Sequence, residues 1–220
     1  MFYIFTFTRM RKKILKLSLL VAICAASAVF TLCKNDEVKP ETPEGVVING
    51  ITWATRNVGK FGTFAENPQS SGMLYQWGRP KAWFDSTIFV TDWDTTISED
   101  SIWKKENDPS PEGWRVPTVE ELERLFDVRK VKGEWCRQNG VNGYKFTDNT
   151  TKVSIFLPAV GYRDTEGRLR GVDASCLYWS ATLIENKDKA FYMELGENDA
   201  SLYGYYARNQ GFSIRCVRAE

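Results

Sequence analysis

The chain has 220 residues, of which 43% are hydrophobic and 14% aromatic, with 29 Lys and Arg against 28 Asp and Glu. This composition predicts one folded domain with a buried core and excludes a chain that is disordered throughout. The sequence contains no histidine, which excludes Ser-His-Asp and Cys-His nucleophile systems and any metal site built on histidine ligands.

Residues 1–32 are typical of an export signal peptide. Five basic residues precede an apolar run from Leu17 to Leu32, and this run is shorter than the ~20 residues that a membrane-spanning helix needs. Met10 begins a signal of more ordinary shape than Met1 does, so Met10 is an alternative start.

The end of this run, "FTLCKNDE", resembles a bacterial lipoprotein signal in which Cys33 is the lipidated first residue of the mature chain. Leu32 departs from that pattern, because such signals carry a small residue there. An ordinary secretory signal or an uncleaved anchor is the alternative, and every version exports the domain. The acidic residues after Cys33 resemble surface-export signals, so we expect an outer-membrane lipoprotein at the cell surface, with the periplasmic face as the alternative.

Residues 33–45 are predicted to form a flexible acidic tether, because this stretch is charged, has two prolines and has Val38 as its one large apolar residue. Without the five basic residues of the signal, 24 basic groups face 28 acidic groups. A protein that neutralises phosphates would carry a basic excess, so nucleic acid is not expected as a partner. The lipid anchor is the only expected contact with the membrane.

The folded domain is predicted over residues 46–220. "VVINGITW" indicates a hairpin around Asn49-Gly50, and "MLYQW" indicates a further strand. Residues 59–72 are loop-like, and a long polar stretch from Asp85 to Asp108 has no sustained period. We expect that stretch to be a large excursion on the surface.

Residues 107–126, "NDPSPEGWRVPTVEELERLF", predict a strand followed by a helix. Pro117 keeps Val116 out of helical geometry, and Thr118 with Glu121 forms a capping box that starts the helix. The apolar residues of this helix fall on one face and should pack on a sheet. Trp114 is expected to fill the joint between the strand and the helix.

The last third of the chain is predicted to be rich in β-strands. "KVSIFLP", "LYWSAT", "KAFYMEL", "SLYGYYA" and "FSIRCVRA" are strand candidates, and turns are predicted at Asn139-Gly140, Asn142-Gly143 and Glu166-Gly167. The expected fold class is α+β, with one or two helices on a twisted, mostly antiparallel sheet and long irregular loops.

Six blocks together resemble the Fibrobacter succinogenes major paralogous domain: "NGITWATRNVG", "YQWGRPKAW", "NDPSPEGWRVPTVEEL", "IFLPAVGYRD", "YWSAT" and "GFSIRCVRAE". The resemblance spans nearly all of residues 46–220 and implies a C-type-lectin-like fold on an exported lipoprotein. It implies no established enzyme activity. The Glu-Pro-Asn, Gln-Pro-Asp and Trp-Asn-Asp triplets of calcium-dependent lectins are absent.

The resemblance also bears on the cysteines. Many members of that family carry a cysteine where this chain has Ser110, paired with a cysteine like Cys216. Here that bridge cannot form, and Cys136, Cys176 and Cys216 permit at most one internal disulfide if Cys33 is lipidated. We favour three free, buried cysteines.

Three candidate sites follow from composition. Aromatic residues beside an arginine could stack on sugar rings and bond to their hydroxyls, with core tryptophans as the alternative: Tyr75, Trp77, Arg79 and Trp83. Carboxylates on the polar stretch could bind calcium, although a solvated acidic loop is the favoured interpretation and no metal or cofactor is expected: Asp92, Asp94, Glu99 and Asp100. Three Asp-Ser/Thr-X sequences resemble O-glycosylation acceptors: Ser86, Thr95 and Ser101.

These observations favour a non-catalytic binding or adhesion module for a glycan or a surface protein. The first alternative is a polysaccharide hydrolase that uses two carboxylates and needs no histidine. The second is a structural component of a surface assembly.

Overall fold

The computed structural model describes residues 44–84, 86–185 and 187–220, which belong to one compact unit. The export signal, Cys33, most of the tether and Asp85 lie outside the described residues. Among the described residues, no helix has the length and apolar character needed to cross a membrane.

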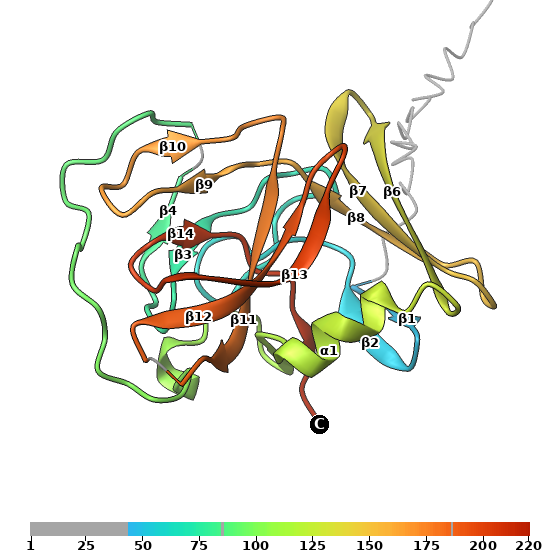
Figure 1. The fold of residues 1–220 in the computed structure, drawn as a ribbon, viewed down its shortest axis with the longest axis horizontal. Helices are drawn as coiled ribbons and strands as arrows, with labels where there is room; N and C mark the ends of the chain where they lie inside the picture. The colour runs from blue at the N-terminus through green and yellow to red at the C-terminus, as the bar shows by residue number, and fades with distance from the viewer. Residues whose placement is uncertain (1–43, 85, 186) are drawn as a thin grey trace, which may run out of the picture. The chain divides into compact units, whose positions relative to one another are not determined.

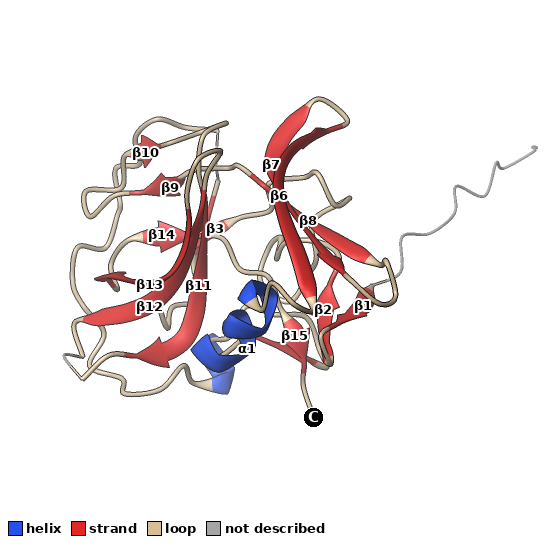
Figure 2. Cartoon of the chain, turned by 45° about the vertical axis from the view of Figure 1, so that its right-hand side comes forward, coloured by secondary structure: helices blue, strands red, loops and turns tan. Residues whose placement is uncertain are grey.

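The described chain forms four antiparallel sheets rather than one (Figures 1 and 2). Their strands, in spatial order, are as follows. The first sheet is β1 (Gly45–Ile48), β2 (Ile51–Ala54), β15 (Val217–Arg218) and β5 (Trp114–Arg115). The second is β10 (Leu169–Arg170), β9 (Tyr162–Arg163), β14 (Gly211–Phe212), β3 (Leu74–Gln76) and β4 (Ala82–Trp83). The third is β11 (Cys176–Leu183), β12 (Lys189–Leu195) and β13 (Ala200–Ala207), and the fourth is β6 (Val131–Gln138), β7 (Val141–Asp148) and β8 (Ser154–Pro158).

The described part holds a single α-helix, α1 (Val119–Glu123), followed by the 3-10 turn η2 (Arg124–Phe126). The predicted capping box is confirmed, because the Thr118 hydroxyl accepts the Glu121 N–H and the Glu121 carboxylate accepts the Thr118 N–H at 2.8 Å. The apolar face of the helix packs against β11, β12 and β13, as expected. With one five-residue helix, the fold is mainly β rather than evenly α+β.

Trp114 is buried beside Val116 of the strand–helix joint but does not pack on the apolar face of the helix. It is 7% exposed and belongs to a different apolar cluster from the helix. The edge of Phe64 meets its ring at 5.5 Å, and Arg218 lies over the ring at 5.3 Å. Trp114 therefore packs in the cluster that also holds Val116 and Ala54, and not in the cluster of the helix face.

The predicted turn at Asn49-Gly50 is confirmed, and so is the turn at Asn139-Gly140 between β6 and β7. In both, Asn and Gly adopt the positive φ that this type of hairpin requires. The prediction at Asn142-Gly143 is wrong, because both residues lie inside β7. A Cβ on Gly143 would lie 2.5 Å from the Phe156 ring, so the glycine serves close packing instead of a turn.

The last predicted strand, "FSIRCVRA", is also corrected. It divides into β14 and β15, which belong to different sheets. Between them, Ser213 pairs with Leu177 and Tyr178 of β11, and Val58 donates its N–H to the Ile214 carbonyl. These residues cross the centre of the molecule, where their backbone groups bond to other segments.

A buried arginine occupies that crossing. Arg215 is 1% exposed and donates to the Asn57 side-chain oxygen at 2.7 Å, the Phe156 carbonyl at 2.8 Å and the Ala54 carbonyl at 3.2 Å. The Tyr178 hydroxyl donates to the same Asn57 oxygen at 3.1 Å. Burial lowers the pKa of Arg215 from its ordinary value, and these oxygens replace the water that its charge has lost.

We expect Arg215→Lys to lower the free energy of unfolding by about 3 kcal/mol, because an ammonium group cannot reach three acceptors in different directions and leaves buried oxygens unpaired. Urea unfolding of the purified protein measures this change. Arg137→Lys, at an exposed arginine of β6, is the matched control and should change stability by less than about 0.5 kcal/mol. Equal stability of the two variants would contradict a central role for Arg215.

The turn after β7 contains a carboxylate, that of Asp148, which should make the stability of the fold sensitive to acid pH. Asp148 accepts the N–H groups of Asn49, Thr150 and Thr151 at 2.8 to 2.9 Å, and these bonds lower the pKa of Asp148 from 3.8 to about 2. A pKa that is lower in the folded state means that ionised Asp148 stabilises the fold above about pH 4, and that this contribution is lost as the pH falls toward 2.

Asp148→Asn should therefore lower stability at neutral pH and reduce the further loss between pH 4 and pH 2. Urea unfolding across this range tests the prediction, with Asp199→Asn in the exposed β12–β13 turn as the control that should match the wild type. An Asp148→Asn curve parallel to the wild-type curve would contradict it.

Candidate functional site

The irregular segment between β4 and β5 is the most distinctive surface feature of the described chain. We call residues 84–108 the excursion; its described residues contain one 3-10 turn, η1 (Lys105–Asn107), and no strand. Figure 1 shows it running around the outside of the second sheet. Its backbone groups lack a ladder of partners, so other groups must satisfy them.

Two buried arginines supply donors to the excursion. Arg163 is 0% exposed and donates to the carbonyls of Phe84 at 2.5 Å and Thr87 at 2.9 Å. Arg208 is 1% exposed and donates to the Ser98 carbonyl at 2.8 Å, while its guanidinium lies 4.1 Å from the centre of the Trp77 ring. Arg163 therefore fixes the start of the excursion, and Arg208 fixes it again at Ser98.

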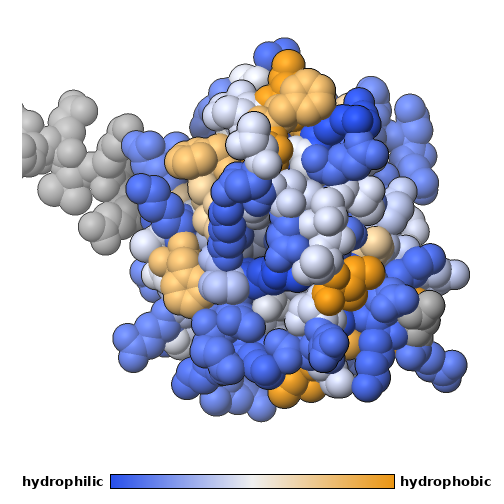
Figure 3. Space-filling model, turned by 90° about the vertical axis from the view of Figure 1, so that its left-hand side faces the viewer, coloured by the Kyte–Doolittle hydropathy of each residue, from blue (hydrophilic) through white to orange (hydrophobic). Residues whose placement is uncertain are grey.

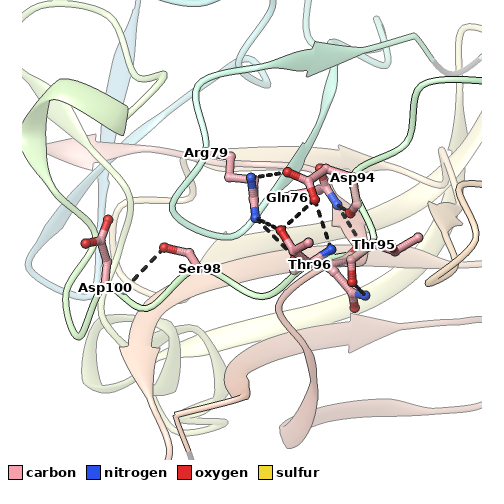
Figure 4. Close-up of polar contacts among 8 residues, drawn as sticks. Gln76, Arg79, Asp94, Thr95, Thr96, Ser98 and Asp100 are labelled. Carbon is pink, nitrogen blue, oxygen red and sulfur yellow. Dashed lines mark hydrogen bonds and ion pairs between the residues drawn. The ribbon is translucent and has the colours of Figure 1, made fainter.

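Two buried amides hold the middle of the excursion (Figure 4). Gln76 donates from Nε2 to the Asp94 carbonyl at 2.6 Å and to the Asn209 carbonyl at 2.8 Å. Asn209 donates from Nδ2 to the Thr95 carbonyl at 2.8 Å. Because Gln76 is 1% exposed and Asn209 is 8% exposed, water competes little for these bonds.

Arg79 also holds the middle of the excursion. Its guanidinium pairs with the Asp94 carboxylate and donates to the Thr96 hydroxyl at 2.8 Å and the Thr96 carbonyl at 3.1 Å (Figure 4). Hydrogen bonds from the Thr96 hydroxyl and N–H, with a smaller effect of Arg79, lower the pKa of Asp94. Arg79 is thus engaged in holding the loop, and its role as a ligand donor stays a prediction.

Aromatic packing reinforces these bonds. Trp93 of the excursion lies against Gly167 and Gly211, where an added Cβ would approach its ring to 2.7 Å, and its ring centre is 4.9 Å from that of Trp83. Trp103 lies 5.1 Å from Trp77 between ring centres. The excursion is therefore fixed by packing as well as by hydrogen bonds.

Several large apolar side chains of the excursion nevertheless face solvent. They are Phe84 (58% exposed), Ile88 (67%), Phe89 (66%) and Ile102 (67%). Figure 3 shows hydrophobic groups separated by hydrophilic residues on the side of the molecule along which the excursion runs. Loops held on a rigid scaffold often carry binding residues, and these separated apolar groups are the ones that the excursion exposes.

The predicted aromatic platform is not formed by the proposed rings. Tyr75 and Trp77 are 0% exposed and Trp83 is 5% exposed, so protein covers their faces. Tyr75 donates its hydroxyl to the Gly59 carbonyl at 2.6 Å, and Trp77 donates Nε1 to the Ser180 carbonyl at 2.9 Å. These residues build the core beneath the excursion, because β3 is covered on both faces.

The proposed calcium ligands do not converge. Asp92 pairs with Lys81, Asp94 with Arg79, and Asp100 with Lys104 at 2.7 Å, while Glu99 is exposed. No group of three potential ligands capable of holding a metal occurs among the described residues. Each aspartate is neutralised by a separate cation, which explains why the acidic stretch does not form one site.

The candidate O-glycosylation residues Ser86, Thr95 and Ser101 are all exposed on the excursion. The Ser101 hydroxyl accepts from Lys187 at 3.1 Å, and the Thr95 carbonyl is held by Asn209. Glycosylation at these residues stays a prediction.

The three described cysteines are free. Cys176 and Cys216 are buried as expected, whereas Cys136 is only partly buried. Cys216 lies beside Ser110, with 3.1 Å between Sγ and Oγ, so the two positions that the family resemblance pairs are neighbours. Burial raises the pKa of Cys216 to about 12, which keeps it a neutral thiol.

The anchors Arg163, Arg208, Gln76 and Asn209 were missed in the sequence. A buried arginine and an exposed one look alike in a sequence, because burial depends on which distant segment covers the side chain. The polar run "ARNQG" between two apolar strands was the one available signal, since it would be unusual in a core unless its groups were paired.

Comparison with known proteins identifies the family. The sequence model of the protein family described as Fibrobacter succinogenes major domain matches residues 32–218, which is most of the chain. No curated protein and no solved structure matched.

The contact between Ser110 and Cys216 predicts that Ser110→Cys will form a disulfide. The bridge would close a loop of more than 100 residues and raise the free energy of unfolding by up to about 4 kcal/mol. Thiol titration of the unfolded protein should show one free thiol fewer than in the wild type, because the bridge consumes Cys216 as well as the new cysteine, and the melting temperature should fall on reduction. Ser101→Cys, on the exposed excursion, should add one free thiol and no redox-dependent stability. A reactive extra thiol in Ser110→Cys would contradict the prediction.

Proposed function

We propose that this chain, which belongs to the Fibrobacter succinogenes major domain family, is a non-catalytic recognition domain of the cell envelope. In this proposal the excursion is its contact surface, and the ligand is a glycan or a surface protein. The observation that carries the proposal is the combination of a loop without regular structure, fixed from below by buried donors, and large apolar side chains left exposed on it.

The fixed loop supports recognition through preorganisation. A mobile loop must lose conformational entropy when it binds, whereas an anchored loop has lost that entropy on folding. Each buried guanidinium or amide group loses its hydration before it bonds to the excursion, and this desolvation costs free energy. We would not expect that cost for a segment without a function. We infer that the shape of the excursion is what the domain presents.

The charges argue against a hydrolase with two carboxylates. Such an enzyme needs one carboxyl group with a raised pKa as its general acid. Every described carboxyl group with a resolved shift has its pKa lowered, with Asp94 and Glu121 held by arginine and Glu134 by two lysines. These groups are ionised at neutral pH and suit structural pairing.

We extend the proposal to fold ancestry and location. Small antiparallel sheets that support one long irregular segment favour a distant C-type-lectin-like relationship. The export signal and Cys33 favour a lipid anchor at the outer membrane. Protease treatment of intact cells that cleaves the domain would support exposure at the surface.

Photo-cross-linking tests the contact surface directly. A photoreactive phenylalanine analogue at Phe89 in the full chain, expressed in its native envelope, should give a discrete adduct with a glycan or protein. Ile88→Ser in the same chain should reduce that adduct at least fivefold by removing adjacent apolar area. The control probe at Val128, which is 82% exposed outside the excursion, should give no such adduct. Identical products from both probes, or none from Phe89, would overturn the excursion as the contact surface.

A further inference from the structure

We propose that the cavity at the C-terminal end of the excursion binds a neutral saccharide unit. This inference rests on the proposed function and names the ligand chemistry of one part of the same surface. None of the site residues expected from the sequence lies in this cavity.

The cavity is formed by two segments that meet near the end of the chain. Trp103 and Lys105 of the excursion form one wall, and the other wall is formed by Asp108 at the end of the excursion, by residues 110–115 and by Ala219. Its volume is about 590 Å³, which lies within the range of small-molecule sites and suits one or two sugar rings.

One wall presents a fixed indole. Trp103 is only partly buried; it packs against Trp77 at 5.1 Å between ring centres, and its Nε1 donates to the Asn107 carbonyl at 3.1 Å. These contacts set the ring orientation before any ligand arrives. Trp103 lines the cavity, and in this proposal its partly exposed indole contacts the C–H side of a pyranose ring.

The opposite wall is rigid as well. The Asp108 carboxylate accepts the N–H of Ser110 at 2.9 Å and the N–H of Val116 at 3.1 Å, so its position is fixed. Ser110 contacts the buried Cys216, which ties this wall to the core. A cavity with two fixed walls needs little reorganisation on binding.

The charges around the cavity select a neutral ligand. The lining contains two cations, Lys105 and Arg115, and two carboxylates, those of Asp108 and Glu112. The Arg115 guanidinium is already paired with Glu121 through two hydrogen bonds of 2.7 Å. No single sign dominates, so neither an anion nor a cation gains a strong attraction. A lining that contains both donors and acceptors beside one partly exposed indole suits a hydroxyl-rich ligand with an apolar face.

An aromatic cage for a cationic ligand does not fit. Such a cage needs open ring faces, but Arg218 lies over Trp114 at 5.3 Å and the Phe64 edge contacts the same ring. Trp114 is only 7% exposed. Trp103 is then the one partly exposed indole of the lining, and it is the ring that we assign to the sugar.

The test is binding of the purified protein to an array of neutral and charged glycans, followed by titration calorimetry with the best neutral oligosaccharide. Trp103→Ala should weaken that binding at least tenfold, and Trp103→Phe should retain more of it. Because Trp103→Ala also removes packing on Trp77, Glu112→Arg serves as a second variant: it places a bulky cation at an exposed position of the wall and should weaken binding by a similar factor. Val128→Ala, outside both the cavity and the excursion, should bind as the wild type does.

Binding of no neutral glycan, binding of charged glycans only, or equal affinity in wild type, Trp103→Ala and Glu112→Arg would overturn the proposal. The cross-link at Phe89 distinguishes failure of the saccharide site from failure of the proposed recognition function. If the adduct persists while no neutral glycan binds, the saccharide site fails and the recognition function stands. If both are absent, the recognition function fails with it.

Discussion

The fold depends on one buried cation and the oxygens that surround it. Arg215 touches carbonyls of β2 and β8, and through Asn57 it shares an acceptor with Tyr178 of β11. Three of the four sheets therefore meet at a single guanidinium. Its planar fork reaches several acceptors at once, which a lysine or an apolar residue cannot do. Arg215 lies on the backbone that crosses between the sheets of β14 and β15.

Buried arginines also hold the excursion on the surface of the domain. Arg163 and Arg208 are as buried as Arg215, and they bond to carbonyls of the excursion. A long loop without strands leaves its carbonyls without partners, and buried donors satisfy them at fixed points. The chain thus uses arginine as a multiple hydrogen-bond donor in its interior. Stability of the core and rigidity of the proposed recognition surface come from one kind of interaction.

Burial also decides which aromatic residues are free to bind. Trp77 and Trp83 support the excursion from beneath, whereas Trp103 lies where the excursion meets the segment before β5 and keeps part of its ring open. The arrangement concentrates recognition in loops above a rigid base. The proposed saccharide site and the exposed residues around Phe89 would then act as two parts of one surface.

The sequence by itself determined the local features: the Asn49-Gly50 turn, the capping box at Thr118 and Glu121, the strand periods of β8 and β11 to β13, the long irregular stretch and the family. Apart from the family, which depends on blocks spread along the whole domain, each depends on residues close together in the chain, whose conformational preferences act without tertiary partners. Only the tertiary structure decided that "FSIRCVRA" divides between two sheets, that Asn142-Gly143 lies within a strand, and that Tyr75, Trp77 and Trp83 are covered while Trp103 is not. Those outcomes depend on which distant segments pack against each residue, and burial of a ring or an arginine is a property of that packing rather than of the local sequence.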